Sequence, residues 1–437
     1  MRARLFCSLA IAVVLGIGGF GLIAGPQAYA DSDAQAQQVG ATNLSTQATT
    51  GTKASKPAKP SKKQLKAFKK ASADFALELF ARSVDAKDKN ANVTIAPLSV
   101  MNALAVTANG ARGKTSKQIR KVLGDGASMS RINKNLAWYN SKLVDVEKAH
   151  ISSANSIWYH NDGSLVMKKK FLKKAKKYYD AEVNPADFSD PATVGSINKW
   201  VAKNTNNMIK RIISQLEPED RIAIVNALYF DAEWLVPYEH GSAVTKKFTN
   251  ANGAKRNVEM LYGTEHTYIE SDNVTGFIKP YAKGYSFVAL LPEEGMSASE
   301  YAKSLDGNTF RSLISHAQNA TVQTAMPKFT LTYSNDSMER QLAAMGIKLA
   351  FTDNANFKDM GTDATGNLYL GSVVHKTKIE LDEKGTKAAA ATAIIMKASS
   401  AFIDAKVVTL DRPFVYSIID NTTKLPVFIG TVSNIGK

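Results

Sequence analysis

The sequence of 437 residues contains a single cysteine, Cys7, close to its amino terminus. One cysteine excludes an intrachain disulfide and a zinc site built from several thiolates. Cys7 also lies within an apolar leader segment, so the rest of the chain has no thiol nucleophile. We expect neither a cofactor nor a metal site in this protein.

The chain has six histidines, and none of them belongs to a G-x-S-x-G or H-E-x-x-H motif. These motifs mark the nucleophile of many hydrolases and the zinc site of many metalloproteases. A histidine outside such a motif is more often a satisfied core residue than a catalytic base. We therefore expect no enzymatic activity.

Acidic residues are scarce: 39 of them face 55 basic residues, for a formal net charge of +16. An excess of this size favours acidic partners or surfaces. Seven lysines lie within one expected helix: Lys168, Lys169, Lys170, Lys173, Lys174, Lys176 and Lys177. They form either a solvated helix face or a site of weak polyanion binding. Nothing predicts a specific nucleic-acid partner.

Residues 1–30 resemble a signal peptide in all three of its parts. Arg2 and Arg4 supply the positive start, and Leu5 to Ala24 is almost entirely apolar. Ala28-Tyr29-Ala30 then offers a small-x-small cleavage site. We expect a secreted, extracellular protein. The alternative is retention at the membrane or the cell wall, because a run of this length could also span a bilayer.

The rest of the chain begins with a polar linker over residues 31–61 and continues with one domain over residues 62–437. The linker is rich in Ala, Gln, Ser, Thr and Lys and has too few apolar residues to form a core. Apolar residues at helical spacing predict a helix over residues 62–84. The continuous apolar run over residues 222–230 predicts a strand buried on both faces.

Further patterns predict helices in the first half of the domain and mostly strands in the second. Expected early elements are a strand at 92–96, helices from 97, over 115–123, over 167–179 and over 198–213, and a strand at 151–159. Short strands dominate from residue 246, apart from helical stretches near 298–316 and 335–346. Helices first and strands later predict an α+β domain with large sheets.

A stretch rich in small residues follows the acidic turn at residue 383. Four consecutive alanines, Ala388 to Ala391, favour a surface helix on local propensity alone. If Thr386 to Met396 lay as a strand instead, one face would carry no charge. Lys387 and Lys397 would then share the opposite face. Such a segment could be exposed in one state and lie within a sheet in another.

Several short motifs, in this order, resemble those of the serpin family of serine protease inhibitors. The resemblance runs from about residue 64 to Lys437. It is carried by N-V-T-I-A-P-L-S at 92–99, N-K-W-V at 198–201, V-N-A-L-Y-F at 225–230 with Trp234, P-K-F at 327–329, His375 within 368–380, and R-P-F at 412–414 leading to F-I-G at 428–430.

The resemblance implies a serpin fold of about nine helices packed on three β-sheets, with an exposed reactive-centre loop at about residues 383–404. The loop resembles that of inhibitory, secreted bacterial-like members. Its hinge would comprise Glu383, Gly385, Thr386, Ala388, Ala389, Ala390, Ala391 and Thr392. Lys387 departs from the glutamate that is usual in the family, and Ala96 departs from a usual serine. Ser99, Asn226 and His375 match the shutter, and Trp234 matches the breach.

The implied mechanism is suicide inhibition, in which a protease cuts the loop and is trapped as the loop enters the central sheet. The family's spacing from Glu383 places the cut between Ser399 and Ser400. The small residues around this bond suit an elastase-like protease. A shift of a few residues would instead place Lys397 or Phe402 at the primary position, for a trypsin-like or chymotrypsin-like target.

Two other functions stay open at this point. The chain could be a serpin-fold binding or storage protein without inhibitory activity. Polyanion binding through residues 168–177 could accompany either function. In each case we expect a monomer.

Overall fold

The computed structural model describes residues 7–17, 57–88, 90–217, 219–239, 241–385 and 405–436, with residues 7–17 described by their backbone. It combines helices and large sheets, as the α+β prediction requires. The described helices are α1 (Lys62–Asp85), α2 (Pro97–Ala108), α3 (Gly113–Gly124), α4 (Met129–Asn140), α5 (Lys169–Tyr179), α6 (Pro191–Asn204), α7 (Ala298–Ser304), α8 (Gly307–Ser315), α9 (Glu339–Ala344) and the 3-10 turn η1 (Leu349–Phe351).

The start of helix α1 is specified by its own sequence. Ser61 and Gln64 form a capping box, in which each side chain accepts a hydrogen bond from the other residue's backbone N–H. Phe68, Phe75 and Phe80 then recur on the buried face. The predicted helix over 62–84 is confirmed. None of the described helices combines the length and the apolar composition needed to cross a membrane.

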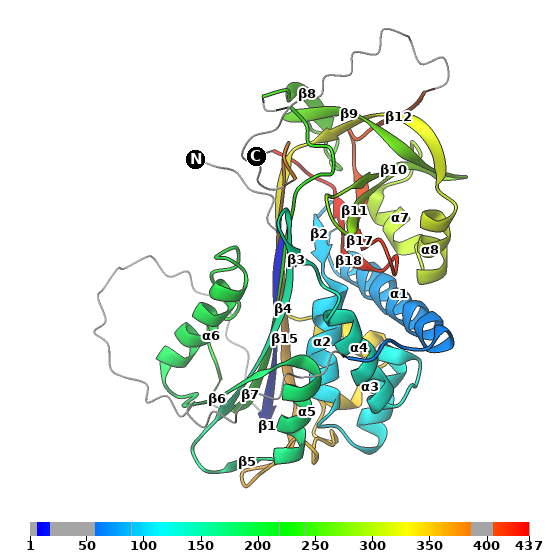
Figure 1. The fold of residues 1–437 in the computed structure, drawn as a ribbon. Coiled ribbons are helices and arrows are strands. Elements are labelled where there is room, and N and C mark those ends of the chain that lie inside the picture. Colours follow the sequence, from blue (N-terminus) through cyan, green and yellow to red (C-terminus); the bar gives the residue numbers. More distant parts are fainter. Residues whose placement is uncertain are drawn as a thin grey trace.

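The first sheet has seven strands in the order β13-β15-β1-β7-β4-β3, with β6 paired to β4. Its central strands run the length of the molecule (Figure 1). The bounds are β1 (Cys7–Ile17), β3 (Asp145–Val146), β4 (Ala149–His160), β6 (Glu182–Ala186), β7 (Asp220–Ala232), β13 (Phe329–Asn335) and β15 (Leu368–Leu381). The buried strand that was expected at 222–230 is the core of β7.

A second sheet has nine strands in the order β16-β12-β9-β10-β11-β17-β18-β2, with β8 paired to β9. Its bounds are β2 (Val93–Ile95), β8 (Val244–Thr249), β9 (Lys255–Ser271), β10 (Val274–Pro280), β11 (Tyr285–Pro292), β12 (Gln318–Pro327), β16 (Lys406–Thr409), β17 (Phe414–Asp420) and β18 (Pro426–Val432). In the described chain, β5 (Leu165–Met167) and β14 (Gly361–Asp363) form the third sheet.

The seven-stranded sheet separates two hydrophobic cores. On one face, α2 packs against β7, and Ile222, Ile224 and Leu228 of β7 belong to the large core. On the other face, α6 covers the alternate residues, among them Ala223 and Val225. Figure 1 shows α6 on the opposite side of the long strands from α1 to α4. Both faces of β7 are therefore buried, which explains its unbroken apolar sequence.

Several predicted helix boundaries are wrong. The helix that was expected over 198–213 is α6, which begins at Pro191, where the Asp190 side chain caps the helix by accepting from Ala192 N. It ends at Asn204, because Asn206 and Asn207 adopt left-handed backbone conformations. The helix that was expected over 167–179 begins at Lys169 instead.

Gly276 of β10 tests how tightly the second sheet is packed. A Cβ atom there would lie 2.1 Å from the carbonyl oxygen of Ala289 on β11. We expect Gly276→Ala to lower the free energy of unfolding by about 1–3 kcal/mol, because the two strands must separate. Urea unfolding measures this change.

Gly195→Ala is the matched control, since Gly195 is exposed on α6 and a Cβ atom there would meet no neighbour outside its own helix. We expect it to be neutral or to stabilise by up to about 1 kcal/mol. Equal losses in the two variants would contradict close packing at Gly276.

Candidate functional site in the seven-stranded sheet

The chain leaves β15 through residues 382–385, which are fastened to the segment that follows β7. Trp234 makes two of the bonds: its Nε1 donates to the Asp382 carbonyl oxygen at 3.0 Å, and its backbone N–H donates to the Lys384 oxygen at 3.1 Å. Tyr238 N–H donates to the Glu383 oxygen at 2.8 Å. Three consecutive carbonyls are thus held at the start of the predicted loop.

Gly385 ends this hinge segment in a conformation that requires glycine. Its φ is +72°, and a Cβ atom would lie 2.3 Å from Trp234 N and 2.7 Å from Ala232 O. An L-residue there would meet both the left-handed backbone penalty and a backbone clash. Gly385 therefore fixes the direction in which the chain leaves the sheet.

Lys328 joins the hinge to the second sheet. Its Nζ lies 3.0 Å from Glu383 and 2.8 Å from Glu259, which belongs to β9. Desolvation lowers the pKa of Lys328, but the hydrogen bonds and charges of the two glutamates outweigh it, so the net pKa is raised. The Glu383 side chain is only 15% exposed, which makes this ion pair stronger than a surface pair.

Trp234 packs against an aromatic neighbour. Its ring stacks on Tyr281 with centroids 4.4 Å apart and planes 12° from parallel. Close by, Asp382 is buried, and this burial raises the pKa of its carboxyl to about 6. The predicted breach residue thus lies at the hinge, next to a carboxyl that takes up a proton below about pH 6.

Ser99 and Asn226, two predicted shutter residues, meet in the middle of the sheet. The hydroxyl of Ser99, on α2, donates to Oδ1 of Asn226 on β7. The Asn226 amide then donates to Ser153 Oγ at 3.0 Å and to Asn155 Oδ1 at 2.9 Å, both on β4. These buried bonds connect the helix to two strands and satisfy the polar groups that the core encloses.

His375, the third predicted shutter residue, is fully buried on β15. Its Nε2 accepts a 3.4 Å hydrogen bond from the backbone N–H of Ala96. Burial lowers its pKa to about 3, so the imidazole is neutral at physiological pH. Its Nδ1 has no hydrogen-bond partner among the side chains that the structure describes.

Strand β1 lies between the two halves of this shutter. Ile11 pairs with His375 on one side and with Asn226 on the other. The structure therefore brings Ser99 and Asn226 together but places His375 one strand away. Residues 7–17, which the sequence assigns to a leader, form the central strand of the sheet. Removal of that leader stays a prediction.

The remaining predicted site residues lie outside the described part of the chain. They include the predicted bond Ser399–Ser400 and the hinge residues Thr386, Ala388, Ala389, Ala390, Ala391 and Thr392. Glu383 and Gly385 are the hinge residues that the structure describes.

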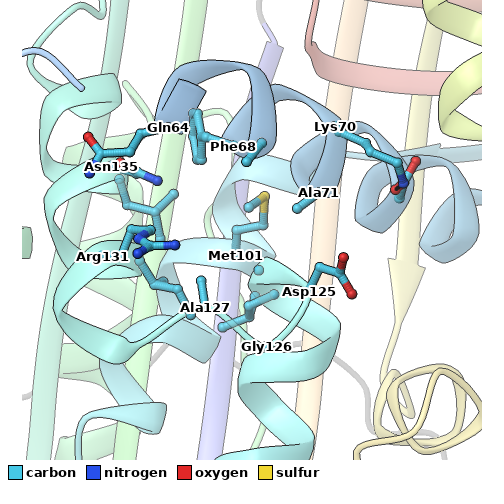
Figure 2. A pocket seen from close by; sticks show the side chains of 16 residues that line it. Gln64, Phe68, Lys70, Ala71, Met101, Asp125, Gly126, Ala127, Arg131 and Asn135 are labelled. Carbon is cyan, nitrogen blue, oxygen red and sulfur yellow. Dashed lines mark hydrogen bonds and ion pairs between the residues drawn. The ribbon is translucent and has the colours of Figure 1, made fainter. Parts of the chain in front are cut away.

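A cleft of about 300 Å³ lies elsewhere, between α1, the turn after α3, and α4. Figure 2 shows Phe68 and Met101 in its interior and the charged side chains of Lys70, Asp125 and Arg131 around it. None of the predicted site residues lines this cleft. It is therefore separate from the hinge and the shutter.

Sequence reasoning missed several contacts of the site. The P-K-F motif contains Lys328 but does not indicate that Glu383 is its partner, and no pattern pointed to Glu259 or Asn155. The register Phe329↔Leu381 between β13 and β15 places residue 328 beside the hinge. That register is the signal that would have found the Lys328–Glu383 pair.

The chain resembles a known protein family over most of its length. The family model described as serpin (serine protease inhibitor) matches residues 70–435. The chain belongs to the serpin family. An uncharacterized serpin-like protein of Thermococcus kodakarensis is 31% identical over 382 residues, which cover 85% of this chain and 86% of that protein.

Solved serpin structures confirm the predicted fold. The thermophilic serpin tengpin in its native state matches with a TM-score of 0.80 and 42% identity, covering 86% of this chain and 96% of tengpin. Human thyroxine-binding globulin in complex with its hormone matches with a TM-score of 0.76 and 25% identity, covering 86% of this chain and 100% of that one. Membership in this family supports a serine protease inhibitor kind of function.

The hinge ion pair of this serpin can be tested by removing Lys328. We expect Lys328→Ala to lower the free energy of unfolding by about 1–3 kcal/mol, because the poorly exposed Glu383 carboxylate loses its partner. Chemical unfolding at neutral pH measures the change.

Lys303→Ala serves as control, since Lys303 pairs with Asp85 at 3.6 Å where both side chains are exposed. We expect a change below about 0.5 kcal/mol there. A loss in Lys328→Ala no larger than in the control would show that the hinge does not depend on this pair.

Proposed function

We propose that this serpin is a suicide substrate for serine proteases. The serine oxygen of the protease attacks the carbonyl carbon of Ser399, and the bond to the Ser400 nitrogen breaks. That nitrogen takes the proton that the serine hydroxyl gives up and leaves as a free amine, while an ester joins Ser399 to the protease. Residues 386–399 then enter the sheet between β7 and β15 and carry the protease with them.

The observation that carries this proposal is that a separate segment of the chain fills the position between β7 and β15 in the seven-stranded sheet. β7 and β15 both pair with a strand between them, so the sheet has room for a central strand at this place. Gly385 lies at the end of this position, beside Trp234 and Ala232. A chain that leaves Gly385 can therefore turn back and run antiparallel to β15.

The lengths and energies are consistent with insertion. Residues 386–399 number 14, as do the residues of β15. As a strand they would span about 46 Å at roughly 3.3 Å per residue. About a dozen new ladder hydrogen bonds, at about 1 kcal/mol net each, give on the order of 10 kcal/mol. This matches the stability of a typical domain, so deforming a bound protease is energetically feasible.

The proposed target is an elastase-like protease, because Ala398, Ser399, Ser400 and Ala401 are all small. Cleavage after Lys397 or Phe402 would instead identify a trypsin-like or chymotrypsin-like target. Mass spectrometry of the released carboxy-terminal fragment distinguishes these bonds. We further propose that the protein acts outside the cell after removal of residues 1–30.

Thr386→Arg tests insertion directly. In the proposed strand, residue 386 lies on the uncharged face, so arginine would place a charge in the core of the sheet. We expect the covalent complex with elastase, seen on denaturing gels, to fall by at least about tenfold while loop cleavage continues.

Lys387→Arg is the matched control, because residue 387 lies on the opposite face, and it should leave complex formation unchanged. If the unmodified protein is cut by elastase, trypsin and chymotrypsin without forming any resistant complex, it is a non-inhibitory binding or storage protein instead.

Polyanion binding is a second candidate function, favoured by a groove between α4 and α5. The groove has a volume of about 630 Å³, and its lining includes Lys169, Lys170, Lys173, Lys174 and Lys177. Lys176, beyond the groove, pairs with Asp180 at 2.5 Å. A groove lined by five ammonium groups suits a sulfated or phosphorylated chain.

Replacing Lys169, Lys173 and Lys177 by glutamine should lower the salt concentration that elutes the protein from heparin, because ion pairs with the polyanion are lost. The control replaces Lys62, Lys63 and Lys66, which are exposed on α1 and carry the same charge. Equal shifts in the two variants would show that heparin binding depends on net charge and not on the groove.

A further inference from the structure

The position between β7 and β15, which we name the central slot, holds one extended segment of the chain. Its occupant is β1, which pairs antiparallel with both neighbours along its length. Cys7 lies opposite Ile379 and Phe230, and Ile17 lies opposite Leu368. Eleven residues from the amino terminus thus supply the sheet's central strand (Figure 1).

The strand in the central slot separates the predicted shutter residues. Asn226 and His375 lie on the two strands that β1 separates, both in register with Ile11. His375 is 0% exposed, yet its Nδ1 has no partner among the side chains that the structure describes. A buried ring nitrogen without a partner is costly.

The same slot is the place that the proposed mechanism assigns to residues 386–399. β1 begins at the hinge end, near Ile379, and runs antiparallel to β15. A loop that turns back after Gly385 would start at the same end and run in the same direction. Two strands cannot form the same ladder with the same neighbours, so their occupancies exclude each other.

We propose that the segment Cys7–Ile17 is a ligand of the central slot, and that a chain retaining it cannot take up its own reactive-centre loop. The leader would then act as a built-in blocking strand. Its removal would free the slot and permit inhibition. The inference that this segment binds the slot rests on the strand pairing alone, whereas the inferred effect on inhibition rests on the proposed function.

The first experiment compares the full chain, produced without export so that residues 1–30 remain, with a chain that begins at Asp31. We expect the full chain to form the covalent complex with elastase at least about tenfold more slowly, since its competent fraction is small. It should also melt several degrees higher, because an occupied slot stabilises the folded state.

The second experiment adds a synthetic peptide of residues 7–17, with Cys7→Ser and a terminal lysine tag for solubility, to the shortened chain. We expect it to raise the melting temperature and to suppress complex formation. The control peptide carries Ile11→Pro, which removes a central N–H and disrupts the ladder. The same substitution in the full chain should restore complex formation.

Three outcomes decide the matter. Equal rates for the full and shortened chains, with no melting shift from the peptide, would overturn the proposal. Equal effects of the two peptides would also overturn it, because binding would then not depend on the ladder. If the shortened chain never traps a protease but the peptide still raises its melting temperature relative to the control peptide, the slot assignment holds and the proposed inhibition fails.

Discussion

A strand in the middle of a sheet must find hydrogen-bond partners for its backbone along both edges, and this requirement governs the whole molecule. β7 and β15 meet it through a strand that lies between them but comes from the far end of the sequence. Every other part of the site is arranged around that position. The hinge lies at one end of it, and the buried polar network crosses its middle.

The hinge and the shutter are held by different kinds of hydrogen bond. At the hinge, residues 382–384 are held by their backbone carbonyls, so their side chains are free for other contacts, such as the Glu383–Lys328 pair. At the shutter, Ser99 and Asn226 are held through their side chains inside the core, where each polar atom must be satisfied. The first restrains where the chain leaves the sheet, and the second ties α2 to the strands.

Local patterns predicted the elements whose burial follows sequence periodicity, such as α1 and β7. They failed for α6, where the Asp190-Pro191 start signal was overlooked. Propensity could not place residues 7–17 in the sheet, because an apolar run carries no information about a strand partner more than 200 residues away. For the same reason the Lys328–Glu259 pair was found only from the folded strands, in which Pro327 of β12 lies opposite Met260 of β9.

The short strand β16 has a consequence for the proposed insertion of the loop. It comprises four residues at the edge of its sheet and pairs only with β12 among the described strands. Because β16 follows the proposed loop in the chain, insertion of an uncut loop would require β16 to separate from β12. Under the proposed mechanism, the pairing of this four-residue edge strand with β12 would therefore oppose insertion of the uncut loop.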